Sequence, residues 1–160
     1  MDLIQDLRSQ HVEIGHALIE LKEILELKKQ HVKIKKSLKG LNDGLDNSLN
    51  NFDIIASLSE LKSTLVSHLE VEDKLLYPSF SKSKDKKLNN MGKKFSDKML
   101  GISKVALSFF DKYSKMTNEM LREDKSFKKD LIGFINVVNK RVNLEETVLF
   151  VEYNKHLSGK

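Results

Sequence analysis

The chain has 160 residues with one proline and no tryptophan, a composition that favours a single helical domain, residues 1–160, over a sheet protein. The absence of cysteine excludes disulfides and thiolate metal sites, so any metal would be held by imidazole, carboxylate or water. A net charge of +5 without aromatic residues among the lysines, and no apolar stretch near the roughly 20 residues that cross a bilayer, predict a cytoplasmic protein that binds neither nucleic acid nor membranes.

The first predicted helix lies near the N-terminus and carries a clear apolar stripe. His11 occupies a core position in that stripe. From about Gln30 to Asn50, glycines and asparagines predict a frayed helix end and the first linker. His31 and His156 lie near expected helix ends, so we assign them no role, and His16 is expected on another face. The stripe recurs at alternating steps of four and three residues, as in a packed bundle: Leu7, His11, Ile14, Leu18, Leu21 and Leu25.

The second predicted helix ends in a pair of ionisable core residues. It is expected to start from a cap at Asn51 or Asp53 and to stop before Pro78. His68 and Glu72 lie four residues apart, which places an imidazole and a carboxylate one turn apart on one helix face. The stripe that contains them is Ile54, Leu58, Leu61, Leu65, His68, Glu72 and Leu75.

Two further amphipathic helices complete the prediction. The third is apolar almost throughout, whereas the fourth places the ionisable residues Arg141 and Glu145 in its core stripe. Four such helices joined by short turns predict an all-α, up-down-up-down four-helix bundle. The two stripes are Leu88, Met91, Phe95, Met99, Ile102, Ala106, Phe109, Tyr113 and Met116, then Phe127, Leu131, Phe134, Val138, Arg141, Glu145 and Val148.

The two halves of the chain look like a duplicated helix pair. The segment that starts at His68 matches the segment that starts at Arg141, so that Glu72 aligns with Glu145. A separate alignment of the first and third predicted helices sets Met99 opposite His11. A helical hairpin cannot bury its apolar face alone, so two copies packed together form the smallest closed core. Buried glutamates without a partner would cost several kcal/mol each, so this layer demands cations.

This pattern resembles the hemerythrin-like, or HHE cation-binding, domain family. The family pattern is a histidine on helix one, His-x-x-x-Glu on helix two, a histidine on helix three and His-x-x-x-Glu on helix four. The resemblance implies a bundle that holds two irons bridged by the glutamates, and it makes His11, His68, Glu72 and Glu145 the metal ligands. Met99 and Arg141 stand at the two remaining ligand positions. Thioether is a weak ligand for a hard iron and guanidinium has no lone pair, so we expect an incomplete site with at most one metal.

Several functions remain open at this stage. In the first, one iron, manganese or zinc ion is bound and Arg141 replaces the second ion, so that the domain senses or handles iron, oxygen or nitric oxide. In the second, the bundle is metal-free and serves as an interaction module for a protein partner or a second copy. The third is a metal-dependent oxidoreductase, although no catalytic residue is evident. Asp73 and Glu146 are either exposed acids, the simpler expectation, or partners that orient a ligand imidazole. Tyr77 and Phe150 are expected to pack at the end of the bundle.

Overall fold

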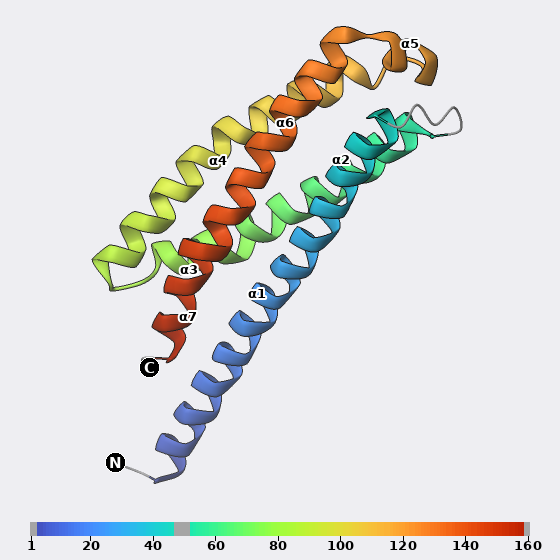
Figure 1. Ribbon diagram of the computed structural model, residues 1–160. Helices are drawn as coiled ribbons and strands as arrows, with labels where there is room; N and C mark the ends of the chain where they lie inside the picture. The colour runs from blue at the N-terminus through green and yellow to red at the C-terminus, as the bar shows by residue number, and fades with distance from the viewer. Residues whose placement is uncertain (1–2, 47–51, 159–160) are drawn as a thin grey trace.

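The computed structural model describes residues 3–46 and 52–158, except for the side chains at positions 6, 9, 11–21, 46 and 156–158. In these ranges it contains helices and no strand, which confirms the predicted all-α class (Figure 1). The elements are α1 (Leu3–Asp46), α2 (Ile54–Val71), η1 (Glu72–Leu76), α3 (Tyr77–Ser81), α4 (Lys86–Tyr113), α5 (Asn118–Glu123), α6 (Lys125–Leu144), η2 (Glu145–Leu149) and α7 (Phe150–Ser158). None of the described helices combines the length and apolar character needed to cross a membrane.

Helix α1 is longer than the sequence predicted. The linker expected from about Gln30 to Asn50 is wrong, because the helix continues to Asp46. Glycine in a helix interior costs only about 1 kcal/mol relative to alanine, and burial of the apolar stripe around Gly40 outweighs that cost. Residues 47–51, where the prediction placed one candidate cap, lie outside the described residues. Among the residues of α1 whose side chains are described, the buried ones other than glycine are Ile24, Leu27, His31, Ile34, Leu38 and Leu41.

The second long helix consists of α2, η1 and α3 in one continuous run, and capping and proline residues lie near its ends. Asp53 caps α2, because its side chain accepts a hydrogen bond of 3.0 Å from the backbone of Ala56. The predicted stop at Pro78 is wrong by about one turn, since the helix continues to Ser81 as α3. Pro78 lies in the first turn of α3, where a missing backbone N–H is tolerated.

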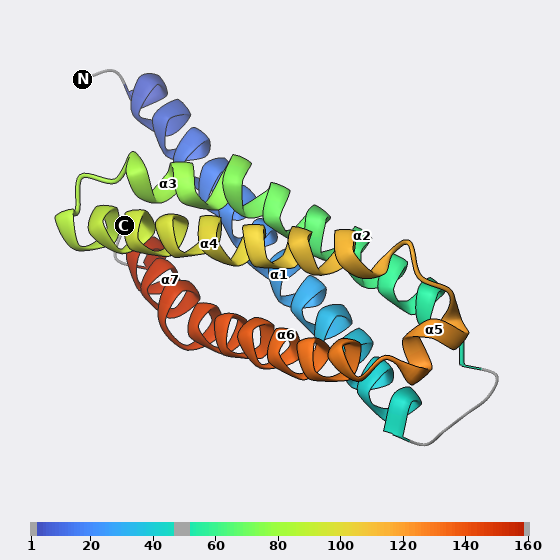
Figure 2. The same cartoon turned by 90° about the horizontal axis from the view of Figure 1, so that it is seen from above.

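The helical rods form a closed ring around one core (Figures 1 and 2). Helix α1 packs against α2 and α6, α4 packs against α6, and α3 packs against α4. The last contact is close because Gly92 of α4 has no side chain, and a Cβ there would collide with Phe80 of α3. Asp85, Thr117 and Asp124 cap α4, α5 and α6.

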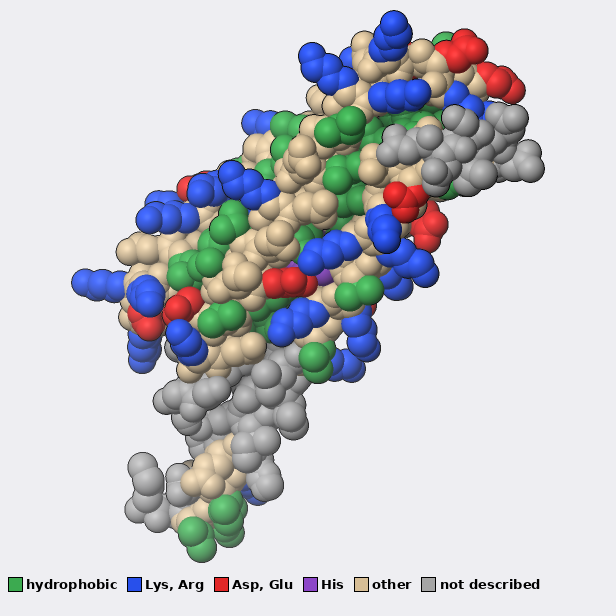
Figure 3. All heavy atoms as spheres, viewed as in Figure 1, with side chains coloured by type: hydrophobic (Ala, Val, Ile, Leu, Met, Phe, Trp, Pro, Cys, Tyr) green, Lys and Arg blue, Asp and Glu red, His purple; other side chains and the backbone are tan. Residues whose placement is uncertain are grey.

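The core consists of two apolar clusters separated by a polar layer. The larger cluster is built from α1, α2, α4 and α6 and includes Phe109 and Phe134, whose rings stack 4.6 Å apart. The buried polar residues between the clusters are His31, His68, Glu72, Arg141 and Glu145. Basic side chains are spread over the outer surface (Figure 3). The smaller cluster contains Ile24, Leu27, Leu76, Tyr77, Phe80, Leu88, Leu149, Phe150 and Tyr153.

Candidate metal centre

Both copies of the repeated motif have the same unusual backbone. Each contains one π-helical segment of five residues, which begins at Glu72 in η1 and at Glu145 in η2. The N–H of Tyr77 bonds to the carbonyl of Glu72, and that of Phe150 bonds to the carbonyl of Glu145. Such single π turns inside α-helices are frequent at functional sites. The glutamates of the two motifs are therefore presented by equivalent backbone.

Four buried side chains converge in the polar layer. His31, His68, Glu72 and Glu145 each offer one ligand atom, and these atoms lie within 4.8 Å of one another. The four residues are at most 4% exposed. Three helical rods supply them, with His31 on α1, His68 and Glu72 on α2 and η1, and Glu145 at the start of η2.

The histidine from the first helix is His31, and the prediction of His11 is corrected. His11 precedes His31 by 20 residues on the continuous helix α1, which is about 30 Å along the axis. The side chain of His11 lies outside the described residues. The observed helix bounds explain the choice, because His31 lies 15 residues before the end of α1 and His68 lies 14 residues after the start of α2. Equal arms of a helical hairpin bring such residues to one level.

Hydrogen bonds fix the orientation of both imidazoles. Nδ1 of His31 donates to Glu146 Oε1 at 3.1 Å, and Nδ1 of His68 donates to Gln30 Oε1 at 3.0 Å. With the proton on Nδ1, the lone pair of Nε2 faces the centre of the site. The two Nε2 atoms are 3.1 Å apart, and both are close to Glu145 Oε1, at 3.0 and 3.2 Å. Three electron-rich atoms therefore meet at one point, an arrangement that a cation or a proton must stabilise.

The two glutamates have different surroundings. Glu72 Oε2 accepts a hydrogen bond of 3.2 Å from Tyr77, while Glu72 Oε1 lies 3.0 Å from His68 Nε2 without a hydrogen bond from any described residue. Burial, and then the neighbouring charge of Glu145, raise the pKa of Glu72 to about 8. Burial alone would raise the pKa of Glu145, but hydrogen bonds with Glu72, His31 and His68 outweigh it and hold that pKa well below its usual value.

The same electrostatics favour a positive charge on His68. Burial opposes the imidazolium, but the neighbouring carboxyl groups of Glu145 and Glu72 outweigh it and raise the pKa of His68 to about 9. The site thus holds a proton where it could hold a metal ion. Metal binding would displace that proton.

Arg141 occupies the other half of the polar layer. Its Nε donates to Glu145 Oε2 at 3.0 Å, and its Nη2 donates to the Tyr77 hydroxyl at 2.6 Å and to the Phe95 carbonyl at 3.0 Å. Its guanidinium also lies 4.7 Å from the centre of the Phe95 ring. Arg141 therefore pairs directly with Glu145 and reaches Glu72 through Tyr77. Met99, one turn after Phe95 on α4, is buried as the sequence pattern predicts.

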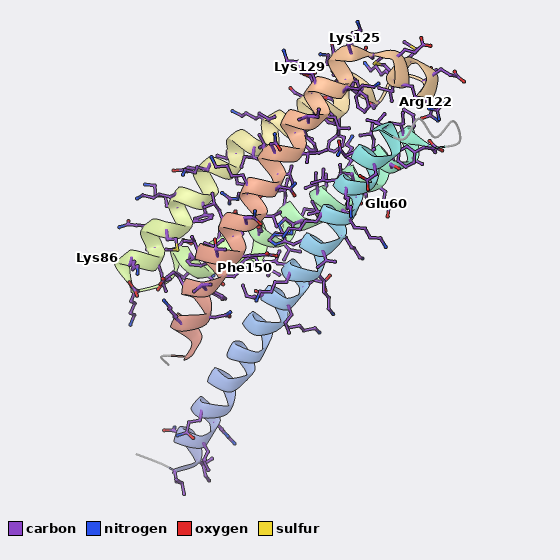
Figure 4. All side chains as sticks on the ribbon, in the orientation of Figure 1. Glu60, Lys86, Arg122, Lys125, Lys129 and Phe150 are labelled. Atoms are coloured by element: carbon purple, nitrogen blue, oxygen red, sulfur yellow. The ribbon has the colours of Figure 1, made fainter. Side chains whose placement is uncertain are left out.

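Sequence reasoning missed three residues of this network. Tyr77 and Phe150 were expected to be packing residues at the end of the bundle, but Tyr77 links Arg141 to Glu72, and Phe150 stacks on His31 with ring centres 5.4 Å apart. Figure 4 shows Phe150 at the start of α7, beside α1. Each follows its glutamate by five residues, the spacing that a π turn places on one face. Gln30 was also missed. Glu146 does orient an imidazole, whereas Asp73 is exposed.

The donor set fits one metal ion of intermediate hardness. Two imidazole nitrogens and two carboxylates suit iron, manganese or zinc. Neighbouring ligands of a six-coordinate ion with bonds of about 2.1 Å lie about 3.0 Å apart. The contacts among the four donors that meet at His68 Nε2 and Glu145 Oε1 are 3.0–3.2 Å. Glu72 Oε1 is buried and has no hydrogen bond from the described residues, as is expected for an atom that binds a metal ion.

Comparison with protein families agrees with this geometry. The model of the hemerythrin HHE cation-binding domain matches residues 2–153, nearly the whole chain. Neither curated proteins nor solved structures gave a match. The match covers both copies of the motif, the α1 segment that carries His31 and the α4 position of Met99. The chain therefore belongs to the hemerythrin HHE cation-binding domain family.

Proposed function

We propose that this domain binds a single non-haem metal ion, preferably iron, and uses it to sense or handle iron, oxygen or nitric oxide. The observation that carries the proposal is the convergence of two Nε2 lone pairs and two carboxylates at one buried point, with both imidazoles oriented from outside by Glu146 and Gln30. His31, His68, Glu72 and Glu145 would hold the ion. A bound ferrous ion would supply a redox-active Lewis acid with affinity for oxygen and nitric oxide.

The residues around the donors limit what can reach them. The four donor residues are almost completely buried, so an organic substrate has no direct access. A surface hollow of about 440 Å³ reaches Tyr77 but not the four donors. Arg141, held by Glu145, Tyr77 and Phe95, supplies a fixed positive charge beside the donors. These features favour a small diatomic ligand over catalysis on a larger molecule.

The experiment is a metal analysis of protein purified without chelator and then loaded with iron(II). We expect up to one equivalent in the wild type and in His11→Ala, and almost none in His31→Ala. His11→Ala is the matched control, because it removes a histidine from the same helix about 30 Å away. Circular dichroism would verify that the variants are folded. Two equivalents in the wild type, or metal retained by His31→Ala, would contradict the proposal.

The competing function is a metal-free bundle that serves as an interaction module. The observation in its favour is that Arg141 pairs with Glu145 and that His68 Nε2 lies within 3.2 Å of both glutamates, so the polar layer has partners without a metal. Less than about a tenth of an equivalent of any transition metal after loading would favour this reading.

A further inference from the structure

A long groove runs along the outer face of α4 and α6. Two adjoining hollows share Val105 and Val137, and the larger has a volume of about 670 Å³. The apolar side chains in it include Val105, Val137 and Leu144, which are 52%, 38% and 37% exposed. Figure 3, in the orientation that shows α4 and α6, has apolar side chains on this face among basic ones. The groove is therefore an apolar strip open to solvent.

The rim of this groove is strongly basic. Its single acidic residue, Asp130, is already paired with Lys112 at 3.2 Å. Arg141 at its inner side is committed to the polar layer. Figure 4 shows one rim lysine, Lys129, on α6 near α5. A ligand for this groove should combine an apolar face with negative charge. The five rim lysines are Lys98, Lys104, Lys112, Lys129 and Lys140.

Two glycines make the groove suitable for a close helix contact. Gly101 of α4 and Gly133 of α6 both line it. A Cβ at either position would meet no described atom within 4 Å, so packing within this chain does not require glycine there. Each glycine nevertheless weakens its own helix. Small residues let another helix approach the backbone closely.

The first part of α1 has the complementary character. Residues 1–27 contain six acidic and only two basic residues, whereas the whole chain has a net charge of +5. Leu3, Leu7 and Leu25 are 70%, 48% and 59% exposed. In both ribbon views the first turns of α1 extend past the other helices of the bundle (Figures 1 and 2). This part of α1 is an acidic helix with exposed leucines.

The spacing of charges also agrees between the two surfaces. Asp6 and Glu20 are 14 residues apart on α1, and Lys98 and Lys112 are 14 residues apart on α4, so each pair spans about 21 Å. In the sequence of α1 an acidic residue followed by an aliphatic one recurs every seven residues, as Asp6-Leu7, Glu13-Ile14 and Glu20-Leu21.

We propose that the acidic first part of α1 of one molecule docks into the basic groove between α4 and α6 of a second copy of this chain. The leucines of α1 would cover Val105 and Val137, and the acidic residues would meet the lysine rim. Direct pairing of two grooves is disfavoured, because it would place lysine rim against lysine rim.

The experiment is a charge swap in the full-length protein, read by analytical ultracentrifugation. We expect the wild type to self-associate, and more weakly at high salt. Asp6→Lys with Glu13→Lys should raise the dissociation constant by about tenfold or more, and so should Lys104→Glu with Lys140→Glu. Combining all four changes should restore association, because the charges are complementary again. Lys33→Glu with Lys36→Glu, in a hollow between α1 and α2, is the matched control and should change nothing.

Each other outcome overturns the proposal. A monomeric wild type at high concentration would show that the two surfaces do not meet. Association lost on reversing the α1 acids but kept on reversing the groove lysines would indicate pairing of α1 with α1. Failure of the combined variant to regain association, although folded by circular dichroism, would exclude the direct contact.

A second variant tests the close approach at the glycines. Gly133→Ala should raise the melting temperature slightly while weakening association several-fold, because the new methyl group fills space meant for the docked helix. Gly40→Ala on α1, where a Cβ also meets nothing within 4 Å, should raise the melting temperature without affecting association. Equal association in both variants would contradict the docking.

Discussion

The two copies of the motif share a backbone and differ in chemistry. The first copy presents His68, Glu72 and Tyr77, and the second presents Arg141, Glu145 and Phe150 at the equivalent places. Both have the same π turn at the glutamate. The first copy contributes a nitrogen donor to the candidate centre, while the second contributes a permanent cation that binds Glu145 Oε2. The same helical frame therefore presents an imidazole in one half and a guanidinium in the other.

The largest expected change makes the two copies chemically alike. Met99→His combined with Arg141→His should restore the ligand set of the family and raise the bound iron from at most one equivalent to two. Both positions are buried, so new imidazoles there would lie inside the bundle. Metal analysis after iron(II) loading measures the effect, with Arg141→His alone as the control. No additional metal in a folded double variant would contradict the assignment of Met99 and Arg141 to the two remaining ligand positions.

Removing the cation of the second copy should be strongly destabilising. Arg141→Ala leaves Glu145 Oε2, the Tyr77 hydroxyl and the Phe95 carbonyl without their partner, and losing one member of a buried ion pair typically costs about 3–5 kcal/mol. Urea unfolding in the presence of chelator measures the free energy of unfolding. Lys140→Ala, at the neighbouring exposed position, should have little effect. An unchanged midpoint for Arg141→Ala would show that the arginine does not support the core.

The two glutamates should respond differently to the same substitution. Without metal near pH 7, Glu145→Gln should cost about 2–4 kcal/mol because an ionised carboxylate with three partners is lost. Glu72→Gln should cost less than about 1 kcal/mol, because a pKa of about 8 keeps the Glu72 carboxyl mostly protonated and the amide resembles that form.

The free energy of unfolding should also depend on pH through the Glu72 carboxyl. The folded pKa of Glu72 lies above its ordinary value of 4.5, so its protonated form stabilises the fold at low pH, and this contribution is lost as the pH rises towards about 8. Glu72→Gln should remove that part of the pH slope of unfolding. Equal costs for both glutamine variants would show that the carboxyls share one environment.

The smallest expected effect lies away from the polar layer, at the contact between α4 and α6. The Tyr113 hydroxyl and Lys112 donate to Asp130 and hold its pKa below the usual value. Their contribution to stability is present above the unfolded pKa and is lost as the pH falls through the folded pKa. Tyr113→Phe should slightly flatten the acid side of the stability curve, measured by thermal melts between about pH 2 and 6. A steeper acid limb would contradict this assignment.

The sequence predicted the helical bundle and four of the buried polar residues. Periodicity placed His68, Glu72, Arg141 and Glu145 correctly, because buried ionisable residues interrupt an otherwise apolar stripe. It placed the first histidine wrongly, since α1 carries one stripe that includes His11 and another that includes His31. Both obey helical spacing, and only the length of the helix decides between them. The linker prediction failed because a packed helix tolerates glycine and asparagine, which in the sequence alone are typical of a turn.

The π turns also have a consequence for how the site can vary. Each turn accommodates one residue more than an α-helix would, so deleting a residue from η1 or η2 would restore regular α-helix and rotate everything after it by about 100°. After η2 that rotation would turn Phe150 away from His31 and Tyr153 out of the apolar cluster. Insertions and deletions here are therefore far more disruptive than substitutions. The five-residue spacing from each glutamate to the following aromatic residue therefore sets which side chains after the π turn face the core.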